Sequence, residues 1–188
     1  MFSRSLILSA AVTLAGFCGS HDARAQGAFT LSSPDFKDGE RLPLKNAGNN
    51  KANPNCVGEN ISPTLSWADP PEGTKSFALL MLDPEGRPPG GVSHWVAYGI
   101  PVSVTGFAEG EVSKLSDKYV GGIGTNKFSW YTGPCTPAGA PHHYIFTLIA
   151  TDLEPTALQP GLTREELFKA LEGHAKLATG LIGTFSKP

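Results

Sequence analysis

Two apolar runs restrict the fold of this chain more than any other feature. They span Phe77 to Leu82 and Ile145 to Ala150, and each is nearly continuous rather than alternating. Short continuous runs of this kind are typical of central strands that are covered on both faces. No long stretch with a 3.6-residue period precedes residue 160, and 22 Gly and 16 Pro separate the apolar segments. The sequence therefore predicts a mainly β fold with C-terminal helices, built as a sandwich or two-layer sheet.

Other strands are expected where short apolar or aromatic segments lie between turn residues. They are Phe29 to Ser32, Thr64 to Ser66, His94 to Ile100, Tyr144 to Thr151 and, more weakly, Phe128 to Tyr131.

The C-terminal part of the chain carries the helical signals. Thr163-Arg164-Glu165-Glu166 has the spacing of a capping box, which predicts a helix from about Arg164 to Glu172. A second short helix is predicted through Lys176, Leu177 and Leu181, and a last strand at Thr184 and Phe185.

The first 25 residues have the pattern of a secretory signal peptide. Arg4 precedes an almost wholly apolar segment, Leu6 to Phe17, and Ala23-Arg24-Ala25 matches an A-x-A cleavage site. An uncleaved anchor would need a longer apolar segment to span a bilayer. We therefore expect residues 1–25 to be removed, leaving a single domain, 26–188, that is periplasmic or secreted.

The charge of the predicted mature chain excludes some partners. The 15 basic residues include Arg4 and Arg24 and the 17 acidic ones include Asp22, which leaves 13 basic and 16 acidic residues and a net charge of −3. No basic run is present, which argues against nucleic acid or an anionic membrane surface as the main partner. No later apolar run is long enough for a transmembrane segment.

Cysteine use fits an exported protein. Cys18 lies within the predicted signal peptide, so Cys56 and Cys135 are the two cysteines of the mature chain. In an oxidising compartment this pair either forms a disulfide or remains as two free thiols.

Two loops with similar endings point to a functional site. The segments Asp83 to Tyr98 and Gly133 to Tyr144 are rich in Gly and Pro, and both end in His and an aromatic residue that open an apolar run. Such loops, held between strands, commonly carry binding residues. We expect Asp83, His94 and His142 to meet in one pocket.

The blocks around these loops resemble a known family. The segments CVGENISPTLSW, DPEGRP followed by HWVAYGIP, and GPCTPAGAPHHYIFTLIATD occur in the order found in the phosphatidylethanolamine-binding protein family, in its bacterial Raf-kinase-inhibitor-like branch. With LTREELFKALEGH, the resemblance covers the chain from about Thr30 onward. It implies a β-sandwich of antiparallel sheets with flanking C-terminal helices and a small anion pocket for phosphate-type head groups.

The resemblance also implies a set of ligand-binding residues. They are Asp83, His94, Gly133, Pro134, His142 and Tyr144. The chain departs from the family pattern D-P-D-A-P at Glu85, Gly86 and Arg87, and His143 stands where Arg is common. Arg87 adds a guanidinium that can contact an anion through two hydrogen bonds.

The resulting prediction is a non-enzymatic binding protein for a small anionic or zwitterionic ligand, without cofactor or metal. A metal site made of Asp83, His94 and His142 has suitable ligand types, but no H-x-x-x-H or clustered Cys/His spacing supports it. A hydrolase would need a nucleophile, and Ser93 is expected to point to the opposite sheet face, with no G-x-S-x-G motif elsewhere. A module that inhibits a protease or kinase through protein–protein contacts is the third alternative.

Overall fold

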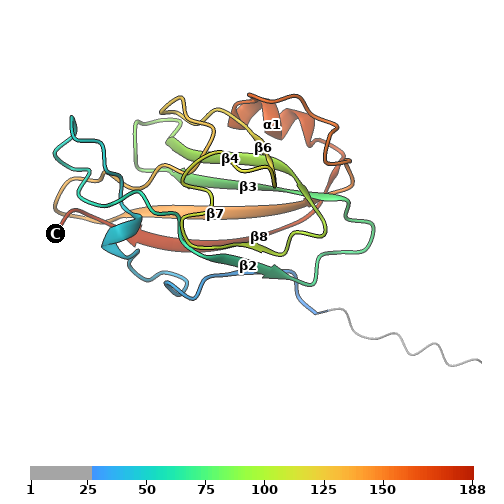
Figure 1. Cartoon of the computed structure of the whole chain (residues 1–188), viewed down its shortest axis with the longest axis horizontal. Coiled ribbons are helices and arrows are strands. Elements are labelled where there is room, and N and C mark those ends of the chain that lie inside the picture. Colours follow the sequence, from blue (N-terminus) through green and yellow to red (C-terminus); the bar gives the residue numbers. More distant parts are fainter. Residues whose placement is uncertain (1–26) are drawn as a thin grey trace, which may run out of the picture.

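The computed structural model describes residues 27–188, which form two facing antiparallel sheets and a single α-helix (Figure 1). The predicted signal peptide and its cleavage site therefore lie outside the described residues. The smaller sheet has the strand order β1-β2-β5 and the larger one β6-β4-β3-β7-β8. The elements are β1 (Thr30–Ser32), a 3-10 turn (Leu44–Asn46), β2 (Leu65–Ala68), β3 (Ser76–Asp83), β4 (Val92–Pro101), β5 (Gly106–Phe107), β6 (Val120–Gly121), β7 (His142–Thr151), α1 (Arg164–Ala170) and β8 (Ala175–Phe185).

The central strand β3 is buried on both faces, as its continuous apolar run predicts. Phe77, Leu79 and Met81 point into the main core between the two sheets. Ala78 and Leu80 point the other way, into a second core beneath α1. Because successive side chains of a strand alternate between faces, a strand with two cores needs apolar residues at every position.

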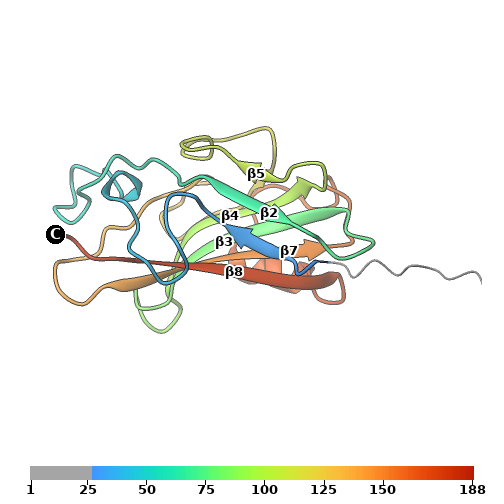
Figure 2. The ribbon, with the colours of Figure 1, turned by 90° about the horizontal axis from the view of Figure 1, so that it is seen from below.

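The smaller sheet and α1 cover opposite faces of the larger sheet. Figure 2 shows the small sheet in front of the larger one and α1 behind it. From the small sheet, Trp67 and Phe107 pack edge to face with ring centroids 5.5 Å apart. From the helix side, Leu167 is fully buried in the second core. The chain thus has the predicted β-sandwich architecture, with one helix added.

The capping box begins α1 as predicted. The Thr163 hydroxyl accepts a hydrogen bond from the backbone N–H of Glu166, and the Glu166 carboxylate accepts one from the backbone N–H of Thr163. The helix itself ends at Ala170.

The predicted second helix is wrong, because this segment is strand β8. It pairs with β7 along its whole length, from Thr151 opposite Ala175 to His142 opposite Phe185. The helical interpretation depended on Leu177 and Leu181, which are four residues apart. That spacing places two side chains on one face of a strand as well as of a helix, so it does not distinguish a helix from a strand. The predicted strand at residues 184–185 is the end of β8.

The weak strand predicted at Phe128 to Tyr131 is also wrong. This segment forms no strand and follows a turn in which Lys127 has a φ of 66°. Within residues 27–188, the helices fall short of the length and apolarity needed to span a bilayer.

Candidate ligand-binding site

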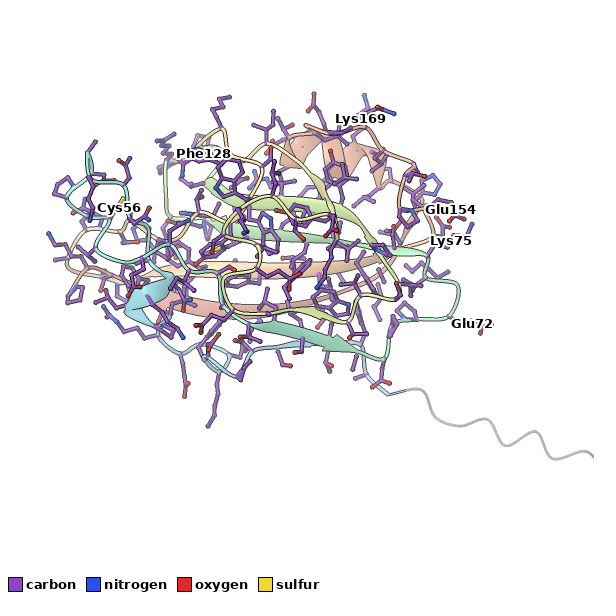
Figure 3. All side chains as sticks on the ribbon, in the orientation of Figure 1. Cys56, Glu72, Lys75, Phe128, Glu154 and Lys169 are labelled. Atoms are coloured by element: carbon purple, nitrogen blue, oxygen red, sulfur yellow. A yellow bond between two sulfur atoms is a disulfide. The ribbon has the colours of Figure 1, made fainter. Side chains whose placement is uncertain are left out.

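A pocket of about 730 Å³ opens at one end of the larger sheet. Its walls come from three parts of the chain: the loop from 48 to 60, the connection between β3 and β4, and the segment from 126 to 144. Because β3 runs antiparallel to both β4 and β7, the end of β3 lies beside the starts of its two neighbours. Figure 3 shows the pocket-lining residues Cys56 and Phe128 toward this end of the molecule, away from Glu72, Lys75 and Glu154.

Asp83, the last residue of β3, forms part of the pocket floor. Its side chain is almost fully buried, with the residue 4% exposed. One carboxylate oxygen, Oδ1, accepts the backbone N–H groups of Glu85 (3.0 Å) and Gly86 (2.9 Å). The other oxygen, Oδ2, lies 2.8 Å from Nδ1 of His142 and accepts its hydrogen bond. These contacts fix the carboxylate and leave acceptor capacity on Oδ2.

His94 forms a second part of the floor, on β4. The residue is 5% exposed, and its Nδ1 lies 2.8 Å from the carbonyl oxygen of Thr132. A carbonyl only accepts, so Nδ1 carries the proton and Nε2 is the free ring nitrogen. Burial lowers the pKa of His94, an effect only partly offset by the hydrogen bond to Thr132. The imidazole is therefore neutral at pH 7, and its Nε2 is a hydrogen-bond acceptor.

The lowered pKa of His94 predicts a specific pH dependence of stability. The unfolded chain binds a proton at His94 near pH 6.5, whereas the folded chain does so only at lower pH. The wild type should therefore lose stability as the pH falls from 7.5 through 6.5 toward the lower pKa of the folded state. His94→Gln should lose less over the same interval, measured by urea unfolding at pH 7.5 and 5.5. His174→Gln, at an exposed histidine, is the control, and equal losses in wild type and His94→Gln would contradict the assignment.

Tyr144 lines the pocket and is deeply buried. The residue is 1% exposed, and its hydroxyl pairs with the hydroxyl of Thr136. Burial strongly raises the pKa of Tyr144, so the side chain remains a phenol. Its ring packs edge to face on His94, with centroids 5.2 Å apart. Tyr144 thus orients His94 as well as facing the pocket.

Gly133 lines the pocket, whereas Pro134 is buried behind it. The backbone N–H of Gly133 donates to Oδ1 of Asn60 at 2.8 Å. The carbonyl oxygen of Pro134 accepts the N–H of Gly48 at 2.7 Å, which joins two walls of the pocket. Among the described residues that form the lining, Pro134 does not appear. Pro134 therefore lies behind the lining, where its carbonyl oxygen links the two walls.

Cys56 and Cys135 form a disulfide, so the alternative of two free thiols is wrong for this structure. Both cysteines line the pocket. The bridge connects the 48–60 loop to the segment that follows Gly133.

Some pocket residues were not predicted from the sequence. Asn60 has a φ of 60°, and its amide group joins the N–H of Gly133 to the carbonyl oxygen of Tyr131. Phe128 was also not predicted. Of the two tryptophans that the sequence offers for an apolar wall of the pocket, Trp130 lines it and packs on Phe128, with ring centroids 4.9 Å apart, whereas Trp95 is in the main core. The Asn60 contacts depend on long-range packing, and no local pattern indicates them.

The β3–β4 loop contributes the residues at which the chain departs from the family pattern. Arg87 lines the pocket and has a φ of 49°. Glu85 lies outside the lining, on the exposed side of the loop, where it contacts Nδ1 of His143 at 2.7 Å. Partial burial alone would raise the pKa of Glu85, but hydrogen bonds from the side chain and backbone of His143 lower it. His143 is exposed and faces away from the pocket side of β7, as alternation predicts.

Comparison with known proteins identifies the family. The family model for phosphatidylethanolamine-binding protein matches residues 32–186. The chain belongs to the phosphatidylethanolamine-binding protein family. A relative from Methanothermobacter thermautotrophicus, named UPF0098 protein, is 36% identical over 159 residues, covering 84% of this chain and 98% of its own. The UPF0098 protein YbhB of Escherichia coli is 31% identical over 159 residues, covering 83% of this chain and 99% of its own.

Solved structures of family members have the same fold. The crystal structure of Escherichia coli YbcL, described as a member of the mammalian phosphatidylethanolamine-binding protein family, aligns with a TM-score of 0.75 at 26% identity. That alignment covers 84% of this chain and 98% of YbcL. A homologue from Chlamydia trachomatis aligns with a TM-score of 0.73 at 33% identity, covering 86% and 99% of the two chains. The expected family and fold are therefore confirmed.

Proposed function

We propose that the protein is an exported, non-enzymatic binding protein whose pocket takes a small anionic or zwitterionic ligand, such as phosphate or phosphoethanolamine. The observation that supports this most directly is the convergence of Asp83, His94 and His142 on one pocket floor. Arg87 lines the same pocket and supplies a permanent positive charge. The signal-peptide pattern of residues 1–25 supports export to the periplasm or beyond.

Complementary groups in the pocket suit the two ends of a zwitterion. The guanidinium of Arg87 and the free nitrogen of His94, once protonated, donate hydrogen bonds to an oxyanion. The remaining lone pair on Oδ2 of Asp83 accepts a hydrogen bond from an ammonium group. Phosphoethanolamine carries both groups on one short molecule, so we expect it to bind more tightly than phosphate alone.

A binding function also agrees with the surroundings of Ser93, the serine that precedes His94 in the sequence. Ser93 is buried, its backbone N–H donates to the Thr125 hydroxyl at 2.9 Å, and its side chain is not part of the pocket lining within residues 27–188. The imidazole of His94 is hydrogen-bonded to the Thr132 carbonyl and not to a serine. The Asp83, His94 and His142 set thus resembles a recognition surface more than an activated nucleophile.

The proposal is tested by titrating phosphate, phosphoethanolamine and acetate into the protein, by calorimetry and by NMR of the histidine side chains. Arg87→Ala should weaken binding of phosphate about tenfold, the typical loss of one charge-assisted hydrogen bond. His94→Ala should weaken it at least as much. Lys169→Ala removes one positive charge on α1, away from the pocket, and should leave the affinity unchanged.

Two results would contradict the proposal. One is the absence of any ligand-dependent shift at His94 and His142. The other is an equal affinity for phosphate in wild type and Arg87→Ala, because Arg87 is exposed and its replacement should not disturb folding.

A further inference from the structure

A second group of polar side chains lies at the edge of the pocket. Asp83, Glu85 and His142 each offer one possible metal-ligand atom, and these three atoms lie within 4.8 Å of one another. The two carboxylates come from the D-P-E turn that ends β3, and the imidazole comes from the first residue of β7. This set differs from the metal site of Asp83, His94 and His142 weighed from the sequence alone, because Glu85 takes the place of His94.

The two carboxylates have no permanent cationic partner. Asp83 pairs with His142, and Glu85 pairs with His143 at 2.7 Å. Within the described part of the chain, neither carboxylate forms an ion pair with Lys or Arg. Because histidine, unlike lysine or arginine, is not permanently charged, the two neighbouring carboxylates favour a cation at this point.

We propose that Asp83, Glu85 and His142 bind a divalent transition-metal ion of the zinc type. Two carboxylate oxygens and one imidazole nitrogen match the ligand types of such ions. Zinc bonds to nitrogen and oxygen of about 2.0–2.2 Å place two ligand atoms of a tetrahedral site roughly 3.4 Å apart. Nδ1 of His142 and Oδ2 of Asp83 are 2.8 Å apart, so a small outward shift lets the ion replace the proton that now lies between them.

The position of this site couples it to the pocket. Three protein ligands leave an open coordination position, as in zinc sites that also hold a water or substrate. Asp83 and His142 both line the pocket, so an oxyanion there can be the fourth ligand of the ion. The charge of the ion also compensates the carboxylates, which would otherwise repel an anion. This coupling to anions rests on the proposed function, whereas metal binding itself does not.

The test is a titration of Zn²⁺ into the chelator-treated protein by calorimetry, with Co²⁺ absorption spectra reporting the ligand geometry. One ion per chain should bind. Glu85→Gln should weaken zinc binding by roughly tenfold or more, since even outer-sphere partners of metal ligands have effects of that size. Glu85 is exposed, so folding of the variant should be preserved, and circular dichroism checks this.

Two matched variants exclude simpler explanations. His142→Gln should lose at least as much zinc affinity as Glu85→Gln, because it removes a proposed ligand. Asp152→Asn should retain zinc binding, because Asp152 and His174 form a similar acid–imidazole pair, 2.8 Å apart, beyond the opposite end of β7. The inference is overturned if zinc binds equally well to Glu85→Gln or to His142→Gln, or if Asp152→Asn loses as much affinity.

Phosphate titrations separate this inference from the proposed function. In the presence of EDTA, Glu85→Gln should bind phosphate at least as tightly as the wild type, because it removes a negative charge, whereas added Zn²⁺ should strengthen phosphate binding in the wild type only. Phosphate binding in EDTA without any zinc binding would overturn the metal site and leave the proposed function standing. Zinc binding without phosphate binding under either condition would support the metal site and contradict the proposed function.

Discussion

Replacing both Cys56 and Cys135 by serine is expected to lower the free energy of unfolding by about 4 kcal/mol, on the loop-entropy estimate. The bridge closes a loop with a sequence separation of 79, which the unfolded chain would otherwise leave open. For a domain of this size the melting temperature should fall by about 10 °C. Urea and thermal unfolding of wild type and variant under oxidising conditions measure the loss.

Single variants and reductant provide the controls for this prediction. Cys56→Ser and Cys135→Ser should each lose about as much as the double variant, because either change opens the bridge. A reducing agent should destabilise the wild type and leave the double variant unchanged. Equal stability of wild type and double variant in the absence of reductant would show that the bridge contributes nothing.

Ligand binding should change less than stability when the bridge is opened. The hydrogen bonds from Gly48 to the Pro134 carbonyl and from Gly133 to Asn60 still join the same two walls of the pocket. Measuring phosphate affinity of the double variant at a temperature where it remains folded separates these two effects.

Gly133→Ala is expected to lower the free energy of unfolding by about 3 kcal/mol, at the upper end of typical overpacking costs. A methyl group at this position would lie 2.7 Å from the carbonyl carbon of Ala47 and from the nitrogen of Gly48, and closer still to the carbonyl oxygen of Asn46. These are backbone atoms, so the two pocket walls would have to separate. Phosphate binding should weaken in parallel, measured by calorimetry.

Gly90→Ala is the matched control for Gly133→Ala. The added methyl group at Gly90 meets no atom within 4 Å, and its φ is not in the left-handed region. Its stability should stay within about 0.5 kcal/mol of the wild type, as for other surface changes. A similar loss in both variants would show that close packing at Gly133 is not the cause.

The sandwich could be predicted from the sequence because its central strands have an unambiguous pattern. The run from Phe77 to Leu82 is apolar at every position, which fits a strand with a core on each face. The start of α1 was equally clear, because a capping box is a local arrangement. Strand β8 could not be predicted in this way, because the four-residue spacing of Leu177 and Leu181 fits one face of a helix as well as one face of a strand. Leu177 is in fact 49% exposed, and pairing with β7 decides the conformation of this segment.

The floor of the site was predictable for a topological reason. Asp83 ends one strand, and His94 and His142 lie near the starts of two others, so antiparallel pairing brings all three to one end of the sheet. Burial of His94 and its bond to Thr132 could not be read from the sequence, since they depend on a loop 38 residues away. The same holds for Asn60, whose contacts with Tyr131 and Gly133 span more than 70 residues.

The location of Asp83 at the end of a strand with a core on each face has a thermodynamic consequence for recognition. Folding of β3 and three hydrogen bonds already fix its carboxylate, so this half of the pocket has lost its conformational entropy before any ligand arrives. Only exposed groups such as the side chain of Arg87 remain to be ordered on binding. A preorganised floor of this kind favours tight binding of very small molecules, which offer few contacts to offset the ordering of flexible parts.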